Sequence, residues 1–516
     1  MHMFHSPRAI GGWVFVWVMS VWVLFASSRA AAATVTAGPG DDVESIIAGL
    51  APGDELVLAD GMYALSGRFS FDIAGTAAAP IVIRAADGAR PHFHRPDASQ
   101  NIWDFSAEHV VIRGLVFSGG SAGLRVEGGA SHLTIEGCEI YDTQDVALRM
   151  NDGGAVYDHV QIRRNHIHDT DGTGEGMYLG CNSNGCQVQN SVIAENWVHH
   201  TNADTVSQGD GIELKEGSFA NTIRDNVIHD TSYPCILTYS TVGNGEPNVI
   251  ERNVMWGCGD HAIQSAADAI IRNNIILSAG ANGIAMQPHQ AGTPSNLEVV
   301  HNTVLKASGH ALSLRGATGT VVIANNALYA MSGRAIDAMG PASMVTVAGN
   351  VGAGGVAGVT GAYVDGDVGV DFVSGHYGGA PPIDPFPAAG GALVAAGDEA
   401  YVVADDFNGT SRVGVADVGA YAYAEGGNPG WTIAEGFRDD VPVMPGTDGG
   451  VPGTDGGGVP GTDGGGVART DSGALPPSGS DDGCGCRTLA PRAAPPWALF
   501  AAIALLAALR QLPLRR

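Results

Sequence analysis

The segment GDGIELKEG, residues 209–217, places an acidic and a basic side chain two residues apart on a short apolar strand. Lys215 is one of two lysines in the 516-residue chain, the other being Lys306. Strand alternation puts Glu213 and Lys215 on the same face. A lysine in this setting can neutralise a substrate carboxylate, or remove a weakly acidic proton if its pKa is lowered. The alternative is an exposed ion pair, worth less than about 1 kcal/mol.

Acidic side chains gather in the two loops that precede this strand. The loops DTDGTGEG and HHTNADTVSQGDG are long and polar, and such loops on a rigid scaffold often carry functional sites. Carboxylate oxygens are hard ligands of the kind that Ca²⁺ takes. The candidate calcium ligands are Asp171, Glu175, Asp204, Asp210 and Glu213.

A repeated segment must position these side chains. Segments such as IRRNHIHDT, IAENWVHHT and IRDNVIHDT recur every 21 to 31 residues. This period indicates a solenoid, and the units are too short and too rich in Ile, Val, Asn and Gly for helical repeats. We expect the shared Asn to form a buried structural ladder, amide to amide. The aligned positions are Leu115, Cys138, Asn165, Asn196, Asn226, Asn253, Asn274, Asn302, Asn326 and Asn350.

A second strand precedes the Asn turn in each coil, as in GLRVE, ALRMN, GMYLG, GIELK, CILTY and AIQSA. Its second and fourth residues are mostly apolar and are expected inside, so the third and fifth point outward. Charged and aromatic side chains gather at the outward positions of the middle coils. The outward candidates for a site are Arg149, Tyr178, Glu213, Lys215, Tyr239, Gln264, Gln287 and Arg315, with His289 next to the column.

This pattern resembles the pectate-lyase-like superfamily of right-handed parallel β-helices over roughly residues 34–425. The resemblance implies an all-β solenoid of about ten or more coils. In that superfamily the outward positions of this strand bind sugar chains. The resemblance therefore implies polysaccharide contacts for Tyr178, Gln264, Gln287, His289 and Arg315.

The stretch GDGIELKEGSFANTIRDN resembles the alginate lyase and chondroitinase B family, in which an acidic run precedes a Lys and an N-T-x-R-x-N segment follows. The resemblance implies a catalytic base at Lys215 and a calcium-binding region at Glu213. Tyr239 holds the place of the family's Arg on the next coil, and we assign it as the acid. Arg149 is the third catalytic candidate. The expected function is β-elimination on a uronate-containing polysaccharide, with calcium as the candidate cofactor.

Two other functions stay open. SQGDGIELKEG also resembles a polygalacturonase segment, although Gly209 replaces one of its two adjacent Asp residues. Hydrolysis needs two carboxylates across the bond, which Asp204 and Asp210 could supply. The other alternative is a non-catalytic, glycan-binding surface protein, because a fold does not define a function.

The net charge of the chain bears on its binding partners. The charge of −27 argues against nucleic acid, and we expect a monomer that binds polysaccharide.

Cysteines and histidines suggest further structural features. Cysteine spacing suggests the disulfides Cys181–Cys186 and Cys235–Cys258, with Cys138 a buried thiol. Three stacked histidines are interpreted as a solvent-side ladder and not as a metal site, because parallel side chains of one column converge poorly on a tetrahedral ion. They are His168, His199 and His229.

The ends of the chain differ in composition from its centre. Residues 1–33 have the features of a secretory signal, with an uncleaved anchor as the alternative. Residues 34–100 are expected to cap the solenoid with a helix in DDVESIIAGL, 101–354 to hold the repeats, and 355–440 the closing strands. Residues 441–483 repeat PGTDGG and predict a disordered linker.

The last segment, residues 484–516, orders a Cys pair, an apolar run of 13 residues and terminal Arg residues. This order resembles the bacterial MYXO-CTERM sorting signal, which implies export and display at the cell surface, with release as an alternative. The run is short for a bilayer-spanning helix, which needs about 20 residues. A plain C-terminal membrane anchor is the other interpretation.

Overall fold

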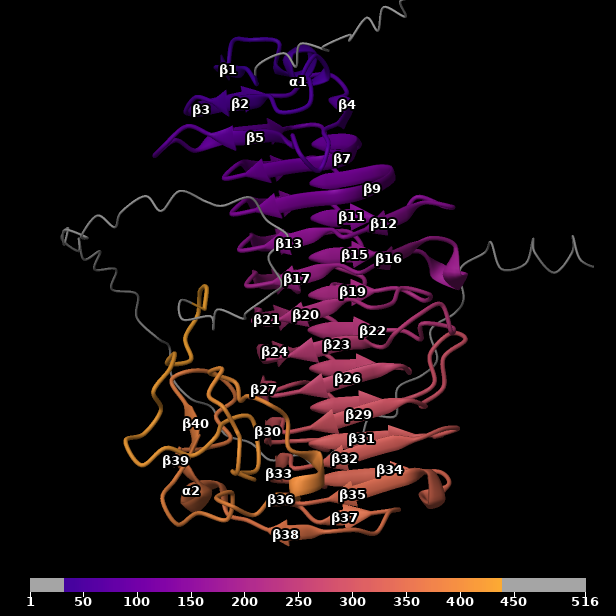
Figure 1. The fold of residues 1–516 in the computed structure, drawn as a ribbon, viewed down its shortest axis with the longest axis vertical. Coiled ribbons are helices and arrows are strands. Elements are labelled where there is room, and N and C mark those ends of the chain that lie inside the picture. The colour runs from indigo at the N-terminus through magenta and orange to yellow at the C-terminus, as the bar shows by residue number, and fades with distance from the viewer. Residues whose placement is uncertain (1–31, 439–516) are drawn as a thin grey trace, which may run out of the picture. The chain divides into compact units, whose positions relative to one another are not determined.

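The computed structural model describes residues 32–438, and the chain up to residue 365 winds into a right-handed parallel β-helix of about 11 turns (Figure 1). This confirms the fold expected from the repeats. Two large parallel sheets, of 25 and 13 strands, run along the solenoid within the described residues.

The 25-stranded sheet covers two faces of the helix, because the long strands β7 and β9 run through both. Its strands are β1 (Thr34–Ala37), β2 (Glu55–Leu58), β4 (Ser70–Ala74), β5 (Ile81–Ala85), β7 (Trp103–Arg113), β9 (Leu124–Glu136), β11 (Leu148–Met150), β12 (Val156–Asp158), β13 (Gln161–Arg163), β15 (Met177–Leu179), β16 (Gln187–Gln189), β17 (Val192–Ala194), β19 (Ile212–Leu214), β20 (Thr222–Arg224), β22 (Ile236–Thr238), β23 (Asn248–Glu251), β25 (Ile263–Ser265), β26 (Ala269–Arg272), β28 (Ile284–Met286), β29 (Leu297–Val300), β31 (Leu312–Arg315), β32 (Val321–Ala324), β34 (Ile336–Met339), β35 (Val345–Ala348) and β37 (Val356–Ala357).

The 13-stranded sheet forms the third face, which we call the back face. Its strands are β3 (Gly61–Ala64), β6 (Pro91–Arg95), β8 (Val116–Gly119), β10 (Glu139–Thr143), β14 (His166–Thr170), β18 (Trp197–Thr201), β21 (Val227–Thr231), β24 (Val254–Cys258), β27 (Ile275–Ile276), β30 (Thr303–Lys306), β33 (Ala327–Ala330), β36 (Asn350–Ala353) and β38 (Tyr363–Asp365).

One central coil shows how the sequence makes the three faces. Strand β19 lies on the face we call the site face, β20 on the middle face and β21 on the back face. Their inward side chains Ile212, Leu214, Ile223 and Ile228 are fully buried. Equivalent side chains of successive coils stack about 4.8 Å apart, so the core is one continuous column of Ile, Val and Leu.

The predicted Asn ladder runs through the turn between the middle and back faces. Asn226 is typical: its Oδ1 accepts hydrogen bonds from Asn196 N at 3.0 Å and from Asn196 Nδ2 at 2.9 Å. Its Nδ2 donates to Ile193 O at 3.0 Å and to Asn253 Oδ1 at 2.9 Å. The ladder thus satisfies buried turn backbone that no strand pairing reaches.

The N-terminal end is capped by helix α1 (Val43–Ala48), as the sequence predicted. Asp42 is its N-cap and accepts a hydrogen bond from Ser45 N at 3.2 Å, which satisfies a free N–H of the first turn. Val43 and Ile47 are buried against the first coil. The helix therefore covers the open strand edge of that coil.

The segment after β38 departs from the expected closing strands. Helix α2 (Val368–Asp371) and the antiparallel pair β39 (Phe372–Ser374) and β40 (Asp384–Pro387) lead into mostly irregular chain. This segment packs its apolar side chains against the back face near β24 to β36 (Figure 1). Buried carboxylates replace strand pairing here, since Asp406 accepts from the backbone of Thr410 and Ala422 at 2.7 and 2.8 Å.

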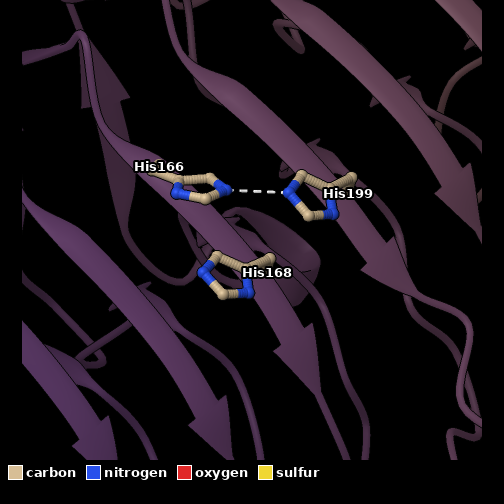
Figure 2. Close-up of side chains that lie close together, drawn as sticks. All are labelled: His166, His168 and His199. Atoms are coloured by element: carbon tan, nitrogen blue, oxygen red, sulfur yellow. Dashed lines mark hydrogen bonds between the residues drawn. The ribbon is translucent and has the colours of Figure 1, made fainter. Parts of the chain in front are cut away.

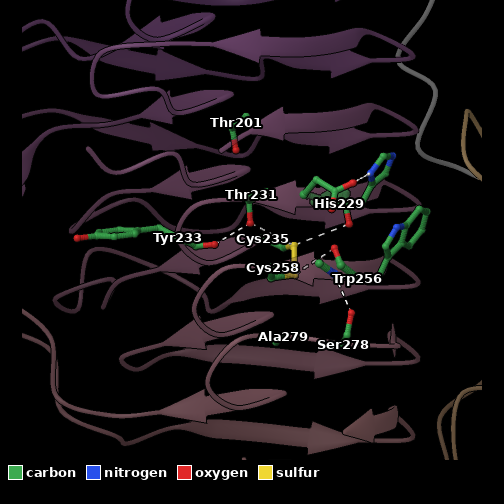
Figure 3. The surroundings of a disulfide bond; sticks show 12 residues. Thr201, His229, Thr231, Tyr233, Cys235, Trp256, Cys258, Ser278 and Ala279 are labelled. Atoms are coloured by element: carbon green, nitrogen blue, oxygen red, sulfur yellow. Dashed lines mark hydrogen bonds and ion pairs between the residues drawn. A yellow bond between two sulfur atoms is a disulfide. The ribbon is translucent and has the colours of Figure 1, made fainter. Parts of the chain in front are cut away.

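Both expected disulfides form, and Cys138 is a buried free thiol. Cys235–Cys258 joins neighbouring coils beside β21 and β24, and Figure 3 shows it between Thr231 and Trp256. No helix between residues 32 and 438 is long and apolar enough to cross a membrane. The expected signal, linker and sorting segments lie outside the described residues.

Candidate active site

Strand pairing confirms the outward column on the site face. Arg149 pairs with Tyr178, Tyr178 with Glu213, and Glu213 with Leu237, followed by Gln264 and Ala285. Lys215 and Tyr239 follow β19 and β22 directly and so occupy the fifth positions of neighbouring coils. The register therefore brings Glu213, Lys215 and Tyr239 together, as the sequence predicted.

These three side chains form one buried network. Lys215 Nζ contacts Glu213 Oε1 and lies 3.4 Å from Tyr239 Oη, while Tyr239 Oη donates to Glu213 Oε1 at 2.9 Å. Glu213, Lys215 and Tyr239 are 1 %, 4 % and 4 % exposed. The alternative of an exposed surface ion pair is therefore wrong, because loops cover the column.

The network fixes where its protons lie. Burial by itself would lower the pKa of Lys215, but the Glu213 carboxylate outweighs burial and the net pKa is raised. Burial and then the charge of Glu213 raise the pKa of Tyr239. Both side chains hold their protons at neutral pH, so Lys215 can act as a base only when its ion pair with Glu213 is relieved.

A more exposed rim lies over this network. Lys215 Nζ is 4.4 Å from the centre of the Tyr178 ring, and His289 Nε2 lies 3.2 Å from Tyr239 Oη. Gln287 Nε2 donates to Gln264 Oε1 at 3.1 Å. Burial and then the charge of Lys215 lower the pKa of His289, so its imidazole is neutral at pH 7. Four predicted sugar-binding residues thus surround or adjoin the network.

Glu213 of the network and two neighbouring carboxylates have no protein partners for most of their oxygens. Glu175, Asp210 and Glu213 are buried, and one oxygen of each lies within 4.8 Å of the others. Both oxygens of Glu175 and of Asp210, and Oε2 of Glu213, are buried without a hydrogen bond. Burial and then neighbouring carboxylates raise the pKa of Asp210. Hard oxygen donors of this kind fit Ca²⁺, whose charge would compensate for their burial.

Four predicted site residues lie elsewhere. Asp171 and Asp204, in the loops before β15 and β19, do not join the carboxylates. Arg149 Nη1 pairs with Asp145 Oδ2 at 3.1 Å, and Arg315 Nη2 pairs with Asp337 Oδ2 at 2.5 Å. Both arginines remain on the site face, but each forms an ion pair with a nearby aspartate and does not join the network.

Sequence reasoning missed how the site is covered. Glu216 Oε1 accepts from Ala291 N at 3.0 Å, and Gln290 Nε2 donates to Asn182 Oδ1 at 2.9 Å. The first contact holds the 288–292 turn against the segment after β19, and the second holds it against the disulfide loop that contains Asn182. An open depression of about 700 Å³ lies among these loops. The acidic Glu216 after Lys215 was the one available signal.

Comparison with known proteins agrees with the fold. The family of the right handed beta helix region matches residues 96–207 and 196–328. No curated protein sequence matches the chain. The family match agrees with the right-handed parallel β-helix that the described residues form.

Solved structures with a similar fold include several lyases. Pectate lyase Pel9A is 14 % identical, with 76 % of this chain and 96 % of that chain covered and a TM-score of 0.45. A mannuronic acid specific family 6 lyase from human gut microbiota is 15 % identical, with coverage of 64 % and 91 % and a TM-score of 0.41. An alginate lyase from Paenibacillus sp. str. FPU-7 is 21 % identical, with coverage of 64 % and 98 % and a TM-score of 0.37.

Proposed function

We propose that this protein is a carbohydrate-active β-helix that cleaves a uronate-containing polysaccharide by β-elimination. The observation that supports this most is the buried network of Glu213, Lys215 and Tyr239, placed between an aromatic rim and a group of unpartnered carboxylates. A passive binding surface would not require a buried lysine, because binding needs only groups that reach the sugar.

The elimination requires two proton movements. The C5–H bond of the uronate breaks, its electron pair forms the C4–C5 double bond, and the C4–O4 bond breaks. Tyr239 holds its proton and is the group we assign to protonate the leaving O4. Lys215 is the base we assign to C5; its ammonium must first release a proton to solvent, which requires that the ion pair with Glu213 be relieved.

Calcium is the cofactor that we propose for the carboxylate group. Glu175, Asp210 and Glu213 would hold it, because five of their six carboxylate oxygens, all but Glu213 Oε1, are buried without a hydrogen bond. When bound, Ca²⁺ supplies positive charge that offsets these carboxylates and attracts an anionic sugar. Tyr178, His289 and Gln287 lie above and would orient the sugar ring.

The cellular location is also a proposal. Two disulfides favour an oxidising compartment, in agreement with the exported and surface-displayed location expected from the chain ends. Polysaccharides are available as substrates in that location.

The test is a substrate panel of alginate, pectate and chondroitin, with calcium and with a chelator. New ultraviolet absorbance from an unsaturated uronate supports the lyase. New reducing ends without that absorbance indicate a hydrolase, and sugar binding with neither signal indicates a binding protein; either result overturns the proposal.

The two lysines provide a matched pair of variants for this assay. Lys215→Ala is expected to abolish the absorbance signal. Lys306→Ala should retain it, because Lys306 lies on the back-face strand β30. Full activity in Lys215→Ala would show that the assigned base is wrong even if the protein is a lyase.

A further inference from the structure

A second group of metal-ligating side chains lies on the back face. His166 and His168 stand two residues apart on strand β14, and His199 lies on the neighbouring strand β18. His166 Nε2 is 2.8 Å from His199 Nε2, and Figure 2 draws this contact as a dashed line. One ring nitrogen of each of the three lies within 4.8 Å of the others.

This triangle differs from the column considered in the sequence. The column does stack, since His168, His199 and His229 have ring centroids 5.1 and 5.0 Å apart and nearly parallel planes. His166 adds a third point from the same strand as His168. His166 and His168, at positions i and i+2 of one strand, and His199 on the adjacent strand surround a point above the sheet. Side chains of a single column lie along one line and cannot surround such a point.

Among the described residues, the ring nitrogens that face that point make no hydrogen bond outside the group, since His166 Nε2 and His199 Nε2 bond each other and His168 Nε2 has no hydrogen bond. The far nitrogen of His199, Nδ1, contacts His200 Nδ1 at 2.5 Å. His168 Nδ1 is 2.7 Å from Asp169 Oδ2, which favours a proton on Nδ1. His166 Nδ1 lies 3.5 Å from Glu139 Oε1. A carboxylate on the far nitrogen of an imidazole is the usual partner of a metal-binding histidine, because it fixes the tautomer and orients the ring.

His229 shows why the group ends at three members. Its Nε2 accepts a hydrogen bond from Trp197 Nε1 at 2.9 Å, and its Nδ1 lies 2.8 Å from Asp230 Oδ2. Both ring nitrogens of His229 are therefore engaged by Trp197 and Asp230, whereas His166 Nε2 and His199 Nε2 bond only each other, a contact that an ion between them would replace. By contrast, His168 Nε2 is buried without a hydrogen bond, 3.5 Å from Glu139 Oε1.

The spacing suits a tetrahedral ion. Nitrogens bound at 2.0–2.1 Å from Zn²⁺ stand roughly 3.3 Å apart, which lies between the 2.8 Å separation of His166 and His199 and the 4.8 Å limit of the group. An open depression of about 610 Å³ is lined by Arg90, Glu139 and His166 among others, so it borders the group on the side of His166.

We propose that His166, His168 and His199 bind a divalent transition-metal ion of the Zn²⁺ type, with Glu139 orienting His166. Imidazole nitrogen favours such borderline ions, whereas the carboxylate group of the site face favours hard Ca²⁺. The two sites lie on different faces, so this metal does not depend on the proposed lyase activity.

The test is zinc titration of the untagged full chain after chelator treatment, with calcium in excess to occupy the carboxylates. We expect one Zn²⁺ per chain from calorimetry. His166→Gln and His199→Gln should each weaken binding by about tenfold or more, and Glu139→Gln by about 10–100-fold. The matched control, His229→Gln from the same stack, should bind as the unaltered chain does.

Cobalt titration of the unaltered chain gives a second readout that needs no variant. Tetrahedral nitrogen ligation should produce visible absorbance, which added zinc removes. Absence of zinc binding, absence of this absorbance, or equal affinity in His199→Gln and His229→Gln would overturn the proposal.

Discussion

Replacing one amide in the middle of the Asn ladder should destabilise the solenoid strongly. Asn226→Ala removes four hydrogen bonds: two that Oδ1 accepts from Asn196 and two that Nδ2 donates, to Ile193 O and Asn253 Oδ1. Asn226 is 1 % exposed, so water cannot replace them.

The magnitude follows from the groups left behind. Asn196 N–H and Ile193 C=O lose these bonds in a buried turn, and an unsatisfied buried polar group costs about 1–3 kcal/mol. Two such groups give a loss of about 2–6 kcal/mol, which is a large part of the 5–15 kcal/mol typical of a folded domain.

The assay is urea unfolding followed by circular dichroism and tryptophan fluorescence. The matched control is Asn202→Ala, because Asn202 is exposed in the loop before β19. We expect the control to stay within about 0.5 kcal/mol of the unaltered chain. If Asn226→Ala also stayed within that margin, the ladder would not stabilise the fold as described.

Three further predictions concern other buried groups. Burial lowers the pKa of Lys306 to about 8 from its ordinary 10.5, so Lys306→Met should remove the cost of burying this charge at pH 7, less the loss of the bond from Lys306 Nζ to Ala279 O, and give a small net stabilisation. That gain should shrink as the pH rises from 8 to 10.5, because the amine of the unaltered chain loses its charge and its burial then costs less free energy. Thermal melts across this pH range measure the change. Cys138→Asn should raise the melting temperature by extending the ladder, since Cys138 N already donates to Asn165 Oδ1 at 3.0 Å. Arg438→Met should lose the 3.0 Å bond to Asp225 Oδ1 and speed proteolysis of the segment after β38, with Arg68→Met as an exposed control. Despite its burial, Asp225 has a pKa lowered chiefly by Arg252, so its contribution should persist above pH about 4 and fade only in stronger acid.

The repeat spacing carried most of the information on the fold. The shared Asn aligned the coils, and the alignment placed Glu213, Lys215 and Tyr239 on neighbouring strands, as β19 and β22 confirm. Period-2 alternation assigned the faces correctly, because one face of every strand must be buried.

The covering of the site could not be predicted in the same way. Lys215 is buried because non-repeating loops cross the column, and loop paths follow from contacts such as Glu216 with Ala291. Asp204 and Asp210 are six residues apart, yet the loop buries only Asp210. His166 escaped notice because an alignment by coil compares one position per turn and overlooks the neighbour two residues away.

The Asn ladder also has a direction. In each ladder asparagine from Asn165 to Asn326, both the backbone N and Nδ2 donate to Oδ1 of the ladder asparagine in the following coil. None of the described bonds between these side chains runs in the opposite direction. Amide dipoles aligned in this manner add head to tail, as peptide dipoles do in an α-helix, and neighbouring bonds polarise one another. The solenoid therefore carries an internal electric polarity along its axis, with the oxygen end toward Cys138 and the donor end at Asn350. A coil inserted without its Asn would divide this single dipole into two shorter ones.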